Sequence, residues 1–193
     1  MLLLAVLLVA GIAGLPQIAI AGPASGETTE ATTQAEPANE AVAELQALYT
    51  DEWAWRQQEF AREQVDDGWQ ASDQLPSVTP EAWHRRAAYW QQVLATLDSI
   101  PLDQLPHDEQ VNAAVFRADI EAMHANAVWR TYEMPFNSDS FFWGYLNPRQ
   151  PYHDAAEWRR FIGRLADLPR YFDEHIANME RGLARGWSVP RVS

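Results

Sequence analysis

The chain of 193 residues contains no cysteine and no lysine, so its 14 basic residues are all arginine. Without cysteine there is no disulfide framework, no thiolate metal site and no cysteine nucleophile. The formal charge of −13 disfavours nucleic-acid binding, because that affinity comes from neutralising phosphates. An apolar fraction of 47% with nine tryptophans excludes wholesale disorder, and the length suits one domain.

The first 21 residues have the pattern of an export signal. Residues 2–15 are uncharged and almost wholly apolar, and Ala19-Ile20-Ala21 forms a small-residue cleavage site. No arginine precedes the apolar run, so the positively charged start that is usual for an export signal is missing. The alternative is a retained membrane anchor, but the run is shorter than the ~20 residues that a membrane span needs. The sequence therefore predicts a signal peptide over 1–21, an exported protein (periplasmic or secreted), and no membrane contact after cleavage.

Residues 22–39 are rich in Thr, Ala, Glu, Gly and Pro without an apolar period, which predicts a disordered linker. Over residues 40–193, apolar positions recur at the 3.6-residue spacing of helices, and no segment alternates with the period of a strand. We therefore predict an all-α fold of antiparallel helices without a sheet. Gly68 is expected to cap the first helix, Thr79 to begin the second and Asp154 to begin the last. Pro169 should break or kink that last pattern into two segments.

The third helical segment, from about residue 107 to 130, is apolar on two opposite sides. One stripe holds Val111, Val115, Ala118, Ala122 and Trp129, and the other holds Phe116, Ile120, Met123 and Ala127. A helix that is apolar on two sides is normally covered on two sides, and a short bundle offers little cover. One stripe is therefore expected to need a partner outside these helices.

Residues 132–153 are rich in proline and aromatic side chains. The segment is too irregular for a helix and too aromatic for a free linker, so a long ordered loop packed on the helices is expected. Trp53, Trp83, Trp90, Trp129 and Trp158 lie on apolar helix faces and are expected in the core. Trp143 and Trp187, in irregular segments, are candidates for binding.

No histidine spacing matches H-E-x-x-H or H-x-x-E-H, and there is no phosphate-binding loop or nucleophile elbow. Two Glu-x-x-His pairs, Glu81 with His84 and Glu121 with His124, would suit a di-metal carboxylate bundle if all four side chains faced the interior. Helical geometry turns the first pair away from the core and leaves the second between the apolar stripes. No catalytic, cofactor-binding or metal-ligating residue is therefore assigned, and the di-metal bundle stays as an alternative.

The C-terminal part carries a recognisable succession of residues. The run from Trp158 to Phe172 contains R-L-x-x-L-P-x-Y-F, M-x-x-G-x-x-x-G follows over residues 179–186, and Pro190 comes after it. This succession resembles the bacterial domain-of-unknown-function family 885, which comprises exported helical proteins. The resemblance covers about residues 42–193.

The resemblance implies a zinc metallopeptidase-like hydrolase, because the family carries a downstream H-E-x-x-P-G-H motif. Its histidines would hold Zn²⁺ and its glutamate would activate a bound water. No position of this sequence matches that motif. The chain is therefore expected to be the N-terminal part of a larger helical fold, inactive and zinc-free by itself, with the rest of the same protein as partner and a peptide as substrate. The alternative of another class is a stand-alone periplasmic helical binding module.

Overall fold

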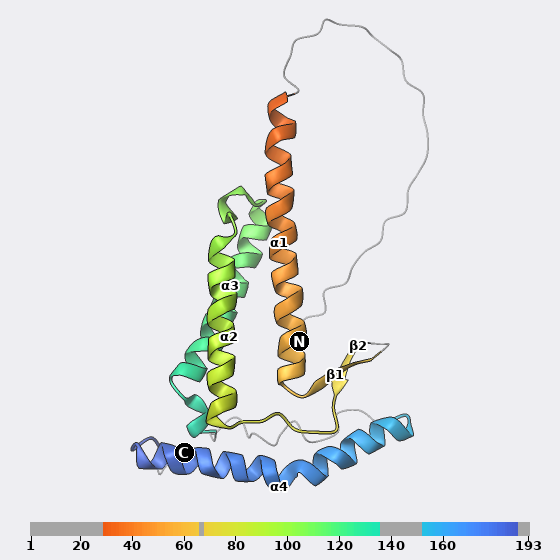
Figure 1. Ribbon diagram of the computed structural model, residues 1–193, viewed down its shortest axis with the longest axis vertical. Coiled ribbons are helices and arrows are strands. Elements are labelled where there is room, and N and C mark those ends of the chain that lie inside the picture. The colour runs from red at the N-terminus through yellow and green to blue at the C-terminus, as the bar shows by residue number, and fades with distance from the viewer. Residues whose placement is uncertain (1–28, 66–67, 136–151, 189–193) are drawn as a thin grey trace, which may run out of the picture.

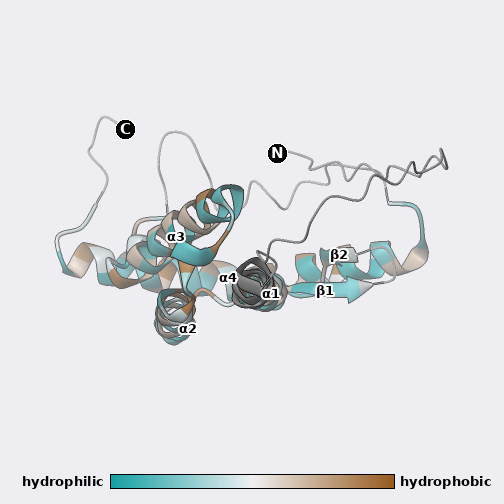
Figure 2. Cartoon of the chain, turned by 90° about the horizontal axis from the view of Figure 1, so that it is seen from above, coloured by the Kyte–Doolittle hydropathy of each residue, from teal (hydrophilic) through white to brown (hydrophobic). Residues whose placement is uncertain are grey.

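Three upright helices stand side by side, and a fourth lies across their lower ends (Figure 1). The computed structural model describes residues 29–65, 68–135 and 152–188. The elements are α1 (Thr29–Glu59), β1 (Arg62–Val65), β2 (Gly68–Ala71), α2 (Pro80–Ser99), η1 (Leu102–Gln104), α3 (His107–Val128), η2 (Thr131–Glu133) and α4 (Ala155–Ala184), where η marks a 3-10 helix. Seen from above, α1, α2 and α3 stand over α4, and the hairpin lies to one side (Figure 2). The all-α class is confirmed, because the described residues contain only one two-stranded sheet.

The second helix begins and ends where its sequence signals lie. The Thr79 hydroxyl accepts a hydrogen bond from the Ala82 N–H over 3.3 Å, and Pro80 is the first helical residue. Ile100 follows the helix in an extended conformation. Local chemistry therefore sets the length of α2.

An apolar core joins the three upright helices. Trp90 of α2 and Ile120 of α3 are buried in one cluster, and Leu45 of α1 is buried in a second cluster with the end of α2. Full burial of a large apolar side chain stabilises by about 1.5–3 kcal/mol. The core also encloses Glu52, which accepts a hydrogen bond from the Trp90 indole over 3.3 Å, and burial raises the pKa of this carboxyl group.

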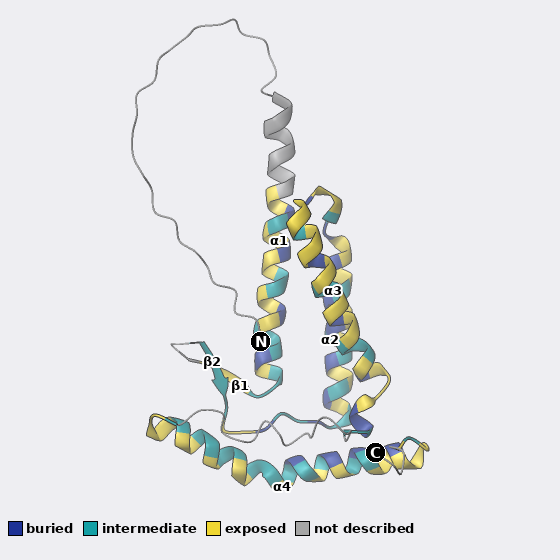
Figure 3. Cartoon of the chain, turned by 180° about the vertical axis from the view of Figure 1, so that it is seen from behind, coloured by how far each residue is buried: buried dark blue, intermediate teal, exposed yellow. Residues whose placement is uncertain are grey.

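The third helix packs only one of its two apolar stripes. Ile120 and Ala127 are buried, and Phe116 is half-buried. On the opposite stripe Val115 is 66% exposed, and Trp129 is 69% exposed. Figure 3 shows exposed residues along this outward side of α3. Within the described residues, the stripe through Val115 and Trp129 thus has no cover.

The first helix starts earlier than the sequence analysis expects. The backbone is helical from Thr29, so the prediction of a disordered linker over 22–39 is wrong from Thr29 onward. Alanine and glutamate, which favour helix, recur in residues 29–39, and a helix extends readily from turns that are already formed. Residues 1–28, which include the predicted signal peptide over 1–21, lie outside the described residues.

A short hairpin follows α1 in place of the predicted glycine cap. β1 and β2 pair antiparallel, with Arg62 opposite Ala71 and Val65 opposite Gly68. The prediction that the fold has no sheet is therefore wrong. Gly68 has a φ of +117°, which favours glycine, but the residue begins β2 and does not cap a helix. An Asp-Gly pair indicates a hairpin turn. The helical spacing of the apolar residues before it favoured the end of a helix instead.

The fourth helix continues through Pro169. Asp154 accepts a hydrogen bond from the Glu157 N–H over 2.8 Å, and the Glu157 carboxylate accepts one from the His153 N–H over 2.6 Å. Of the two outcomes predicted at Pro169, a break into two segments is wrong, because α4 is one helix with Pro169 inside it, whereas the predicted kink agrees with the bend of α4 (Figure 1). Figure 1 shows α4 bent, as expected where a proline removes a hydrogen bond and its ring crowds the preceding turn.

Several tryptophans are less buried than their helical positions predict. Trp90 is 1% exposed, whereas Trp53 and Trp158 are each 51% exposed. The core prediction is therefore wrong for Trp53, Trp129 and Trp158. Trp143 belongs to residues 136–151, the larger part of the predicted 132–153 loop, which lie outside the described residues.

Candidate functional site

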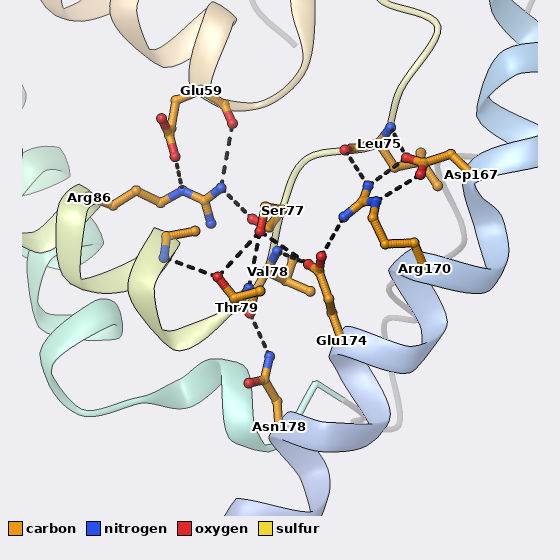
Figure 4. Close-up of polar contacts among 11 residues, drawn as sticks. Glu59, Leu75, Ser77, Val78, Thr79, Arg86, Asp167, Arg170, Glu174 and Asn178 are labelled. Carbon is orange, nitrogen blue, oxygen red and sulfur yellow. Dashed lines mark hydrogen bonds and ion pairs between the residues drawn. The ribbon is translucent and has the colours of Figure 1, made fainter.

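Polar side chains of α4 hold the backbone of the segment that leads into α2 (Figure 4). The Asp167 carboxylate accepts a hydrogen bond from the Leu75 N–H over 2.8 Å, and Arg170 donates to the Leu75 carbonyl over 2.8 Å. Arg170 also donates to Asp167, and this hydrogen bond lowers the pKa of the Asp167 carboxyl group. Both backbone groups of Leu75 are thus satisfied by side chains of one distant helix.

A second set of such contacts lies further along α4. The Glu174 carboxylate accepts hydrogen bonds from the Val78 N–H over 2.7 Å and from the Ser77 hydroxyl over 3.2 Å. The Asn178 side chain donates to the Val78 carbonyl over 2.6 Å, and both residues are buried. Side chains of α4 therefore bond to backbone groups of the segment that precedes α2, beside a buried cluster of Leu75, Val78 and Tyr171.

Two glycines allow this close approach of α4. A Cβ at Gly163 would lie 2.6 Å from the Asp73 carbonyl oxygen, and a Cβ at Gly182 would lie 2.6 Å from the Glu133 carbonyl oxygen. Real Cβ atoms are essentially never found that close. Gly163 and Gly182 are therefore required by the packing of α4 on its neighbours.

Arg86, a fully buried arginine of α2, lies beside the same segment (Figure 4). Its Nε donates to the Glu59 carboxylate over 3.1 Å, and one terminal nitrogen donates to the Ser77 carbonyl over 2.6 Å. The guanidinium carbon also lies 4.6 Å from the ring centroids of both Phe60 and Trp83. Burial lowers the pKa of Arg86, and the negative charge of Glu59 opposes that shift.

A pocket of about 500 Å³ opens where α2, α4, the hairpin and the 72–79 segment meet. Its lining includes the rings of Phe60, Trp83 and Tyr171 and the basic side chains of Arg62, Arg164 and His175. The volume falls within the range of small-molecule sites, roughly 300–1,000 Å³, and an apolar wall with a few polar groups is their usual composition. This pocket is the candidate functional site.

The basic groups of the pocket are held in place by the fold. Arg62 donates to the Trp69 carbonyl over 2.7 Å, and Arg164 donates to the Ser72 carbonyl over 2.8 Å. Burial lowers the pKa of His175 to about 4, although the negative charge of Glu174 acts to raise it. At neutral pH the imidazole is therefore uncharged, and the two guanidinium groups supply the positive charge.

No functional role was predicted for these residues from the sequence. Arg86, Arg164 and His175 lie on helices that the apolar spacing predicts, and no short motif joins them. A usable signal was present on α4, where Asp167, Glu174 and Asn178 repeat at helical spacing on one polar side. Their partners lie about one hundred residues away, which the spacing does not reveal.

The two Glu-x-x-His pairs do not assemble a metal centre in the described residues. His84 and His124 line one shallow hollow between α2 and α3. Glu81 is exposed in the first turn of α2, and Glu121 pairs loosely with Arg117 at 4.0 Å. Across the described ranges, no group of three or more His, Asp or Glu side chains could hold a metal ion.

Trp187, the second candidate for binding, lines a small cavity of about 130 Å³ near the end of α4. The guanidinium carbon of Arg185 lies 4.9 Å from its ring centroid. Arg185 also forms an ion pair with the buried Glu133 carboxylate, with Nε 3.0 Å from Oε2. The contacts of Trp187 thus belong to the attachment of α4 to η2.

The apolar side of α4 faces away from the bundle. Five large side chains on α4 are 42–63% exposed: Trp158, Ile162, Leu165, Ile176 and Leu183. At 100° per residue they fall on one side of the helix, opposite the polar side that holds Asp167 and Asn178. Figure 3 shows exposed residues along the side of α4 that faces away from the bundle.

These features define a mainly helical protein whose last helix is docked by its polar side. The model of the family described as "Bacterial protein of unknown function (DUF885)" matches residues 62–193, and the chain belongs to this family. The predicted family membership is therefore confirmed over that range. Searches of curated proteins and of solved structures give no match. In the described part of the chain, no helix is long and apolar enough to cross a membrane.

Proposed function

We propose that this chain is a non-catalytic helical region of an exported zinc-dependent hydrolase of the peptidase type. The observation that carries the proposal is the outward apolar side of α4, the row from Trp158 to Leu183. Soluble proteins rarely leave a long contiguous apolar patch in water, and such patches usually mark an interface. The exposed stripe of α3 has the same character.

The catalytic chemistry is assigned to another part of the protein. The described residues do not fit a zinc centre, because no cluster of three or more His, Asp or Glu side chains exists among them. The motif that the family resemblance implies, H-E-x-x-P-G-H, would sit on the partner part. The role of this chain is to pack against that part and to help form the wall of a cleft for a peptide.

The test compares this chain with the product of the complete reading frame of its gene. The longer product should contain about one zinc ion per molecule, whereas the 193-residue chain should contain none. A reading frame without a His-Glu-x-x-His-like zinc motif would end the proposal.

Packing on α4 can be followed by thiol labelling, because the chain has no cysteine of its own. Ile176→Cys should react freely in the 193-residue chain and be protected in the longer product. Arg159→Cys, an exposed control away from the apolar row, should react in both. Equal labelling of Ile176→Cys in both proteins would show that nothing packs on this side of α4.

Export is tested by the N-terminal sequence of the mature protein. If the signal peptide ends at Ala21, protein recovered from the periplasm or the medium should begin at Gly22. Protein that is recovered only from the cytoplasm with Met1 intact would contradict export.

A stand-alone binding module is the second candidate function, and the pocket beside Arg164 and Trp83 is the observation that favours it. Under this hypothesis the 193-residue chain is a soluble monomer with little affinity for a hydrophobic dye. Dye binding and aggregation would count against it, because they would report the uncovered side of α4.

A further inference from the structure

We infer that the pocket where α2, α4 and the hairpin meet binds an aromatic carboxylate. Arg62 and Arg164 hold the carboxylate group, and the aromatic wall of the pocket receives the ring. The inference goes beyond the proposed function, because it requires neither zinc nor a partner for the outward side of α4.

The charge of the pocket is opposite to the charge of the chain. The formal net charge is −13, yet the described lining contains two arginines and no aspartate or glutamate. A guanidinium group presents five N–H donors in a planar fork that matches a carboxylate. The backbone carbonyls of Trp69 and Ser72 anchor Arg62 and Arg164, and within the described residues each guanidinium is hydrogen-bonded through one terminal nitrogen. Donors therefore remain for a ligand on groups that are already positioned.

The apolar part of the ligand follows from the opposite wall. The guanidinium carbon of Arg86 lies 4.6 Å from the ring centroids of Phe60 and Trp83, and Trp83 also stacks on Tyr132 with ring centroids 5.3 Å apart. These contacts hold the rings rigidly, as an aromatic ligand requires. The Trp83 indole N–H is buried without an acceptor in the described residues. A ligand oxygen would supply one.

The charge state of His175 bears on the kind of anion that fits the pocket. The uncharged imidazole adds no positive charge to the lining, so Arg62 and Arg164 supply the charge that attracts an anion, and a carboxylate with an apolar body fits this lining. The chemistry is shared by free aromatic acids and by the C-terminal aromatic residue of a peptide. Two probes separate these sources, 4-phenylbutyrate for the free acid and N-acetyl-L-phenylalanine for the peptide end.

The experiment is calorimetric titration of the whole chain with each probe and with its uncharged amide. We expect both acids to bind and each amide to bind about tenfold more weakly or worse, because it loses a charge-assisted hydrogen bond. Tighter binding of N-acetyl-L-phenylalanine than of 4-phenylbutyrate would identify a peptide end as the natural ligand, and the reverse order would identify a free acid. Equal affinities of acid and amide, or no binding of either acid, would overturn the inference.

Variants locate the binding in this pocket. Arg62→Gln and Arg164→Gln should each weaken binding of the acids about tenfold and leave the amides unchanged, whereas Arg159→Gln, exposed elsewhere on α4, should change neither. Because Arg164 also holds Ser72, a melting curve must accompany each variant. Ala71→Trp keeps both arginines and fills the pocket from β2, so it should abolish binding of acids and amides alike. Unchanged binding in a folded Ala71→Trp protein would place the ligand elsewhere and contradict the inference.

Discussion

The side-chain amide of Asn178 donates to the backbone carbonyl of Val78 over 2.6 Å, and neither residue is exposed to solvent. The carboxylate of Glu174 accepts from the N–H of the same Val78. One residue at the entrance of α2 thus has both backbone groups satisfied by α4. These hydrogen bonds act together with a small apolar cluster in which Tyr171 of α4 is buried against Leu75 and Val78, while the row from Trp158 to Leu183 faces outward.

Removal of the Asn178 amide should weaken this attachment strongly. Asn178→Ala leaves the buried Val78 carbonyl without its donor, so we expect the free energy of unfolding to fall by about 1–3 kcal/mol. Urea unfolding followed by circular dichroism measures the change. Asn126→Ala, at an exposed position of α3, should change it by less than about 0.5 kcal/mol. Equal effects of the two variants would show that the Asn178 hydrogen bond adds nothing measurable to the free energy of unfolding.

A methyl group at Gly182 should destabilise the protein although it favours helix. In an open helix, glycine to alanine stabilises by roughly 0.5–1 kcal/mol. Here the new Cβ would lie 2.6 Å from the Glu133 carbonyl oxygen, so α4 must move away from η2. We expect Gly182→Ala to lower the melting temperature, and Gly163→Ala to do the same through Asp73. A rise in melting temperature for either variant would contradict the close packing.

Glycine at position 61 should stabilise the turn between α1 and β1. Ala61 has a φ of 56°, a left-handed conformation that costs a residue with a Cβ about 1–2 kcal/mol. Part of the gain is lost, because glycine makes the unfolded chain more flexible by about 0.4–1 kcal/mol. We therefore expect Ala61→Gly to raise the free energy of unfolding by about 0.5–1 kcal/mol. Ala54→Gly, inside α1, should lower it, and a fall in both variants would rule out strain at Ala61.

The stability of the protein should decrease below about pH 6.5 because of His175. Burial lowers its pKa from 6.5 in the unfolded chain to about 4 in the folded protein. Between these values the unfolded state binds more protons, so the contribution is complete above pH 6.5 and is lost as the pH falls toward 4. The full shift corresponds to about 3 kcal/mol.

The control for this pH dependence is a pair of variants measured by denaturant unfolding from pH 4.5 to 7.5. His175→Gln should flatten the slope of unfolding free energy against pH, whatever its effect on absolute stability. His107→Gln, at an exposed position, should leave the slope unchanged. A slope that survives in His175→Gln would assign the pH dependence to other groups.

The limits of the helices could be predicted because their causes are local. The Thr79 hydroxyl and the Asp154 carboxylate bond to N–H groups three residues further on, so the signal and its effect lie within one turn. The prediction at Gly68 was wrong, because a glycine at this place can either cap a helix or follow a hairpin turn. Pairing with β1 makes it the first residue of β2. At Pro169 the helix bends as the proline predicts but does not end, because the contacts of Asp167 and Arg170 hold the chain on both sides of the proline.

The candidate site could not be predicted from the sequence. Arg62, Arg164 and His175 come from a hairpin and a helix that no local rule brings together. Arg86 is buried only because Glu59 and two aromatic rings surround it after folding. The sequence of an amphipathic helix does not show that one of its arginines will be buried in this way.

The helical class, the acidic charge, the caps at Thr79 and Asp154 and the family membership follow from the amino-acid sequence. That α4 turns its polar side inward and that a pocket forms beside Arg164 became visible only in the folded chain. Helix formation and capping depend on neighbours within a few residues, whereas the orientation of α4 depends on backbone groups of Leu75 and Val78 far away in the chain. Periodicity shows that α4 has an apolar side, but only the placement of those distant groups decides which side meets the protein.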